Sequence, residues 1–133
     1  MRTFTIPLIL AIALSAATAP IAGAHGGEAV YGETADGTGT FVVAFGRFVT
    51  DEVHRIHVVR VCLQRREAGG RWRTLDCARE RSFKRRDDTV AVTADCRRTR
   101  VYRAQVFGHV VTRNDKIRHR AHGTTAPEAI ACD

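Results

Sequence analysis

The feature that most constrains this chain is a pair of cysteines placed symmetrically about two glycines. Cys62 and Cys77 are equally distant from Gly69-Gly70, and the segments between them are rich in residues that favour β-strands. Because glycine readily adopts the positive φ angles of tight turns, the sequence predicts a β-hairpin that turns at Gly69-Gly70. This hairpin places Cys62 opposite Cys77, within reach of a disulfide bond. It also carries Trp72, which we expect to be its large aromatic anchor.

Further β-type segments lie on both sides of the hairpin. Alternating apolar residues predict strands over residues 40–48, 53–66, 89–96 and 101–112. No segment from His25 onward carries a sustained helical period, and turn signals recur about every 8 to 12 residues. The expected fold class is therefore all-β, a small disulfide-stabilised β-sandwich of the immunoglobulin-like kind.

Three local features of this pattern give more specific expectations. The apolar residues change phase at Val58-Val59, which predicts a β-bulge or a crossing between sheets at that step. Residues 50–52 are predicted to form a turn. The charged segment 79–88 is interpreted as a connection between strands, with Phe83 as its one candidate core residue.

The first 24 residues have the features of a signal peptide. Arg2 forms a positive n-region, residues 6–19 form an apolar h-region, and Ala22-Gly23-Ala24 fits an A-x-A cleavage motif. The apolar stretch is shorter than a membrane span requires. We therefore expect a secreted protein that begins at His25 and has no membrane span after signal cleavage, with an uncleaved anchor as the alternative.

The remaining residues have the length of one domain. Residues 25–39 are rich in glycine and threonine and are interpreted as an extended N-terminal arm, followed by the β-sandwich domain over residues 40–133. Ala29-Val30-Tyr31 is the only apolar cluster of the arm, and one short strand there is an alternative. The arm has few apolar side chains, so we expect it to contribute little to the core. It can add a strand to a partner or lie in the partner's cleft; a disordered tail is the alternative. The predicted partner-binding residues are His25, Gly26, Gly27, Glu28, Ala29, Val30 and Tyr31.

All four cysteines follow the signal peptide, as expected for an exported protein. Four cysteines permit three pairings. The hairpin favours Cys62 with Cys77, which leaves Cys96 to pair with Cys132 and hold the C-terminal segment. Since no Cys-x-x-Cys spacing is present, a zinc ribbon or a thioredoxin-type site is not expected.

No set of residues in the sequence predicts catalysis. Ser82, the only serine after the signal peptide, lies in a charged segment without a Gly-x-Ser-x-Gly context. The acidic residues occur mainly as adjacent pairs at predicted turns. Because no nucleophile has an evident base and orienting group, we predict a protein that is not an enzyme and uses no cofactor.

The chain is basic, with a formal net charge of +7, and Lys84 and Lys116 are its only lysines. The arginine excess is consistent with genomic codon bias, whereas the net charge is also consistent with an anionic partner. Export argues against nucleic acid as that partner, which leaves a polyanion-binding or antimicrobial protein as an alternative function. The basic clusters are Arg79, Arg81, Lys84, Arg85 and Arg86; Arg97, Arg98, Arg100 and Arg103; and Arg113, Lys116, Arg118, His119 and Arg120.

A second alternative function is copper binding. An N-terminal histidine chelates copper through its α-amine and ring nitrogen, and His25-Gly26 after an A-x-A motif resembles the start of small exported copper carriers and copper oxygenases. The pairs His54/His57 and His119/His122 are poor ligand pairs within a strand, since residues i and i+3 face opposite sides.

The layout of the chain also resembles a protein family. The carrying residues are Val61-Cys62-Leu63-Gln64, Trp72 with Leu75 and Cys77, and Cys96 followed by Tyr102-Arg103. Together with the arm, they resemble small two-disulfide β-proteins of filamentous soil bacteria, and among these the chain is similar to adapter subunits of umbrella toxin particles. The resemblance implies a secreted adapter that bridges a lectin-bearing subunit with a trypsin-like domain to a large repeat-containing toxin. It further implies that residues 25–39 enter the partner's cleft.

Overall fold

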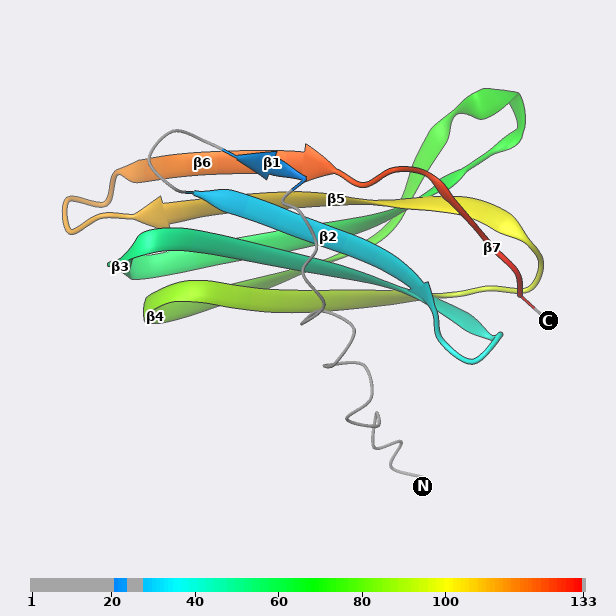
Figure 1. The fold of residues 1–133 in the computed structure, drawn as a ribbon, viewed down its shortest axis with the longest axis horizontal. Coiled ribbons are helices and arrows are strands. Elements are labelled where there is room, and N and C mark those ends of the chain that lie inside the picture. The colour runs from blue at the N-terminus through cyan, green and yellow to red at the C-terminus, as the bar shows by residue number, and fades with distance from the viewer. Residues whose placement is uncertain (1–20, 24–27, 133) are drawn as a thin grey trace, which may run out of the picture.

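A computed structural model describes residues 21–23 and 28–132, and it confirms the all-β, disulfide-stabilised sandwich class (Figure 1). Within these described residues, the one helical element is the short 3-10 turn η1 (Ala68–Gly70). In this part of the chain, no helix has the length and hydrophobicity needed to cross a membrane. The strands are β1 (Ala22–Gly23), β2 (Ala29–Asp36), β3 (Phe41–Arg66), β4 (Trp72–Asp95), β5 (Arg100–Val111), β6 (Ile117–Thr124) and β7 (Glu128–Ile130).

The sandwich is made by one antiparallel sheet that bends over on itself. The strand order is β1-β2-β3-β5-β6, with β4 also paired to β3 and β7 to β5. The first half of β3 pairs with β2 and the end of β4, whereas its second half pairs with β5 and the start of β4. Both long strands turn at the left of Figure 1, and we call this region the bend end: residues 50–55, 83–86 and the β5–β6 loop 112–116.

The bend of β3 lies where a turn was predicted, but the chain remains in a strand there. The register between β3 and β4 is interrupted between Val49 and His54, and it runs without a shift through Val58 and Val59. The predicted irregularity at Val58-Val59 is therefore wrong. Both valines are buried, and the cross-strand neighbours of Val58, Arg81 and His109, have side chains long enough to cover the outer face.

The core lies between the two layers of the bent sheet. The strand predicted over 101–112 is confirmed as β5, and its alternate residues Tyr102, Ala104, Val106 and Val110 are all buried. Trp72, in contrast, stays at the hairpin surface, with the Arg103 guanidinium 4.1 Å from its ring centroid. The prediction that Trp72 is the large aromatic anchor of the hairpin is therefore wrong. Phe48 and Tyr102 are the largest side chains that are fully buried.

The predicted hairpin and both predicted disulfides are confirmed. Cys62 is directly opposite Cys77 in the β3–β4 register, and the two are bonded. Gly69 and Gly70 have φ angles of 83° and 82°, which glycine adopts without a steric penalty. The second disulfide joins Cys96 to Cys132 across 36 residues and holds the segment after β7.

Much of the segment predicted as a free arm is a strand of the sandwich. β2 pairs with β3 over its full length, and Val30 is completely buried in the core. The expectation that residues 25–39 contribute little to the core is therefore wrong. One large apolar residue suffices on this strand, because a Cβ on the next inward position, Gly32, would already lie 2.9 Å from Val106. His25, Gly26 and Gly27 lie outside the described residues.

Candidate functional site

The bend end carries a surface pocket of about 600 Å³ that joins exposed apolar and basic side chains. Val53 and Phe83 line it with 60% and 66% of their surfaces exposed. The expectation that Phe83 enters the core, and that its segment is a loop, is wrong: residues 79–88 belong to β4. The pocket is lined by Val53, His54, Arg55, Phe83, Lys84, Thr112 and Arg113.

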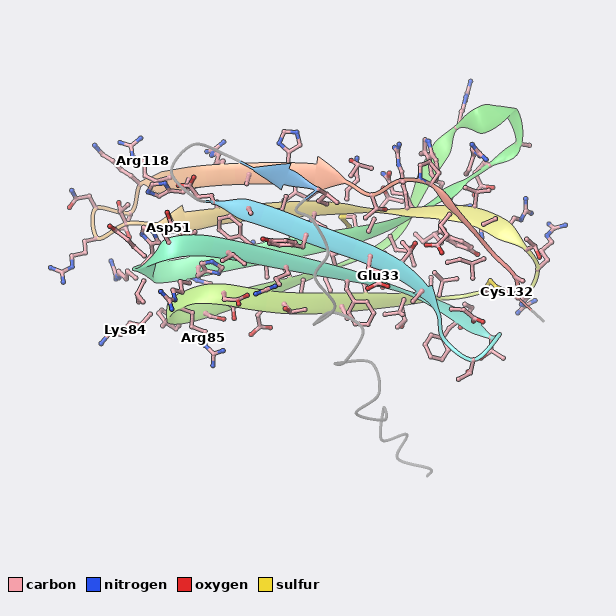
Figure 2. All side chains as sticks on the ribbon, in the orientation of Figure 1. Glu33, Asp51, Lys84, Arg85, Arg118 and Cys132 are labelled. Atoms are coloured by element: carbon pink, nitrogen blue, oxygen red, sulfur yellow. A yellow bond between two sulfur atoms is a disulfide. The ribbon has the colours of Figure 1, made fainter. Side chains whose placement is uncertain are left out.

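The backbone directly after Phe83 explains how that ring comes to be presented. Lys84 has a φ angle of 52°, and Asp115 in the neighbouring loop has one of 57°. A left-handed conformation is uncommon outside glycine and persists where the surrounding structure holds it. Figure 2 shows Lys84 and Arg85 where β4 turns, and Asp51 of β3 at the same end of the molecule. The same turn that bends the sheet therefore leaves Phe83 on the surface.

Positive charge surrounds the apolar part of the pocket. Arg55 reaches Asp115 at 3.6 Å and donates to the carbonyl of Arg113 at 3.4 Å, which links β3 to the β5–β6 loop. Lys84 and Arg113 also line the pocket, and among the described residues neither has an ion-pair partner. The rim is therefore suited to a partner that brings acidic groups around an apolar contact.

A buried histidine–aspartate pair lies close to the bend end. The ring of His57 is fully buried, stacks on Phe48 with centroids 4.7 Å apart, and places Nδ1 3.1 Å from Asp88 Oδ2. Burial lowers the pKa of His57, and the charge of Asp88 offsets only part of that effect. The neutral imidazole therefore donates its Nδ1–H to the carboxylate.

Ser82 lies opposite His57 in the β3–β4 register, so serine, histidine and aspartate come together in this part of the sheet. A nucleophilic serine needs a hydrogen bond to the base that removes its proton. In the described part of the chain, His57 Nε2 has no hydrogen-bond partner, and the ring is closed off from solvent. Ser82 is therefore not activated by His57 in this arrangement. The contacts of His57 and Asp88 are those of a buried pair that supports the fold.

The structure brings together two histidines that sequence reasoning considered only within single strands. Glu28, 4% exposed, pairs with Nδ1 of His119, and the ring of His54 lies 5.0 Å from that of His119. The signal that could have found this cluster is long-range pairing, which spacing within one strand does not contain. Over residues 21–23 and 28–132, no group of three His, Cys, Asp or Glu side chains is placed to hold a metal ion.

The other predicted site residues divide between the core and the sheet edges. Val30 is buried, and Tyr31 stacks against the guanidinium of Arg47 at 5.2 Å, so neither presents a free side chain. The first basic cluster runs along β4, which pairs only with β3 among the described strands. Charged residues on such an edge prevent pairing with other chains. Its exposed members are Arg79, Arg81, Lys84, Arg85 and Arg86.

Comparisons with protein-family models, with curated proteins and with solved structures gave no match to this chain.

Proposed function

We propose that this is a secreted, non-enzymatic adapter that binds another protein through the bend end. The observation that carries the proposal is the pair Val53 and Phe83, both more than half exposed in one pocket. Exposed aromatic and aliphatic side chains in a recess, inside a polar rim, are typical of the residues that contribute most to protein binding.

The chemistry of the rim indicates what kind of partner fits. Arg55, Lys84 and Arg113 provide positive charge around the apolar contact. A partner surface with an apolar recess and a ring of Asp or Glu side chains complements this arrangement. Bridging a lectin-bearing, trypsin-like subunit to a large repeat-containing toxin, as in umbrella toxin particles, is the setting that the sequence resemblance suggests for such an adapter.

The two disulfides support the secreted part of the proposal. Disulfide bonds persist in oxidising compartments, and small exported domains use them because their cores are limited. Both bonds join residues that follow the predicted cleavage motif, so the exported chain keeps them.

The proposal is tested by capture of partners from culture supernatant with the tagged exported protein and its Phe83→Asp variant. Loss of a central aromatic contact costs about 2 kcal/mol or more, so capture should fall at least roughly thirtyfold. Phe107→Asp is the matched control, since Phe107 is also a partly exposed aromatic residue but lies outside the pocket.

Two further measurements are needed. One distinguishes a loss of binding from a loss of folding, and the other tests whether charge contributes to binding. Thermal unfolding of the Phe83→Asp variant should match that of the wild type, because the ring is mostly in solvent. Capture by the wild type should also weaken as salt rises. If the Phe83→Asp variant captures the same partners as the wild type, or if Phe107→Asp is equally impaired, binding through the bend end is ruled out.

A further inference from the structure

A short segment ahead of the predicted cleavage point is packed against the edge of β2. β1 pairs with the start of β2, with Ala22 opposite Val30 and Gly23 opposite Ala29. The N–H of Ile21 donates to the carbonyl of Val30 at 2.9 Å. The side chain of Ile21 is half-buried and packs on the hydrophobic core.

Ile21 occupies a small apolar space beside Gly32, which we call the seat. A Cβ on Gly32 would lie 3.2 Å from Ile21 Cδ1, 2.9 Å from Val106 and 3.0 Å from Thr125. A side chain at position 32 would therefore press on the tip of Ile21 as well as on Val106 and Thr125. The seat accepts a branched aliphatic side chain that arrives from outside the sheet.

Removal of this segment would expose backbone groups as well as the seat. The carbonyl of Val30 faces β1, and because backbone groups point to alternate sides along a strand, those of Gly32 and Thr34 face the same outer side. In the part of the chain that the structure describes, β2 has only β1 and β3 as strand neighbours. Cleavage after Ala24 would leave this edge with free donors and acceptors.

The edge of β2 lacks the basic residues that protect the other edges. β2 has no lysine, arginine or proline, and its two acidic residues, Glu33 and Asp36, lie beyond the stretch that pairs with β1. The segment of β4 that follows Cys77 is dense in arginine, and β6 carries Arg118 and Arg120. Since charged and bulky residues on an edge oppose strand addition, β2 is the edge at which a further strand can pair.

We propose that in the exported protein the β2 edge binds an extended segment of a second protein, which presents an isoleucine- or valine-like side chain followed by small residues. That segment takes the place of Ile21, Ala22 and Gly23: its backbone pairs with Val30, and its aliphatic side chain fills the seat beside Gly32. The inference rests on the proposed export and cleavage, and it gives the adapter a second docking surface besides the bend end.

The test compares the exported form, residues 25–133, with a form that starts at Ile21 and keeps the covering segment. The probe is an acetylated, amidated peptide of residues 19–24, titrated while the backbone amide resonances of the protein are followed by NMR. Saturable shifts of Val30 and Gly32 are expected in the exported form and not in the longer form. An Ile21→Ser peptide should bind at least tenfold more weakly, since the seat is left empty.

Several outcomes would overturn this inference, and each leaves the bend-end proposal open to its own test. One is the absence of saturable shifts in the exported form; another is equal shifts in the two forms. A concentration-dependent dimer of the exported form that protects Val30 and Gly32 from hydrogen exchange would make a second copy of this chain the occupant. N-terminal sequencing that finds residues 21–23 on the secreted protein would show that the edge stays covered. Phe83→Asp should leave peptide binding unchanged, which separates the two surfaces.

Discussion

The two ends of the sandwich are held together in different ways. At the right of Figures 1 and 2, the Cys96–Cys132 bond ties the end of the chain to the segment between β4 and β5. The hairpin that carries Cys62–Cys77 extends on the same side. The bend end has no disulfide among the described residues, and it combines exposed apolar side chains with left-handed backbone at Lys84 and Asp115.

This difference shows where the fold is secured. Covalent ties and buried side chains hold the disulfide end and the middle of the sheet, so Val53 and Phe83 can lie in solvent at the bend end at little cost to the fold. Exposed apolar side chains that contribute little to packing are the ones that suggest a binding surface, as we propose for the bend end. The contrast predicts that substitutions at the two ends will affect different measurements.

The largest effect on stability is expected from opening the disulfide end. Replacing Cys96 and Cys132 with serine removes a cross-link across 36 residues, which in the chain-entropy model costs about 4 kcal/mol. Chemical denaturation should show the loss, and the folded fraction of the variant should still capture partners through the bend end. A loss of capture at full folding would break the separation between the two ends. Non-reducing peptide mapping of the wild type checks the pairing itself.

A smaller but clear difference is expected between two valines. Val30→Ala removes buried apolar groups from the core and should lower the free energy of unfolding by about 2 kcal/mol. Val53→Ala changes a side chain that is 60% exposed and should change it by less than about 0.5 kcal/mol. Denaturant unfolding of both variants measures this, and equal effects would contradict the assignment of β2 to the core.

These two valines also show what could be read from the sequence. The alternation in 89–96 and 101–112 predicted strands, and the symmetric cysteines predicted both disulfides, because strand period and turn chemistry are local. Val30 lies in a glycine- and threonine-rich segment with little apolar pattern. Its burial depends on the close approach of β2 to Val106, which only the tertiary fold creates.

The candidate site was less predictable than the fold, for the same reason. The charged run around Phe83 reads as a loop, because arginine and lysine weaken any alternating pattern. It is an edge strand in which most residues face solvent. Its sequence therefore does not show the alternation of apolar and polar residues that marks a strand. The cluster of Glu28, His54 and His119 joins the residue before β2 to β3 and β6, and no spacing along the chain encodes it.

The stability of the fold near the bend end should depend on pH through His57. Burial lowers the pKa of His57 in the folded protein below its value of about 6.5 in the unfolded chain. Below that pH the unfolded chain binds more protons, so stability is complete above pH about 6.5 and is lost as the pH falls toward the folded pKa. Denaturation midpoints between pH 8 and pH 5 measure this loss.

The variant His57→Asn isolates this contribution. Asparagine keeps an N–H donor for Asp88 but does not titrate, so the pH dependence of the variant should be flatter than that of the wild type. A residual slope is expected from His109, whose pKa burial and the charges of Arg120 and Arg79 also lower. An unchanged slope in His57→Asn would show that the pair with Asp88 does not control acid stability.

The smallest effect is expected from copper. Among the described residues no group of three His, Cys, Asp or Glu side chains is placed to hold a metal ion, and His25 lies outside them. An ion bound by His25 would add a tie to the chain besides the two disulfides. We expect the chain that begins at His25 to bind copper no better than one with an extra residue before it. The extension removes the α-amine from the chelate, so a true site at His25 would weaken sharply. Competition against a chromophoric chelator measures both affinities, with His119→Ala as a third chain. Submicromolar binding that disappears on extension, together with a higher melting temperature in copper, would favour copper binding over protein binding as the function.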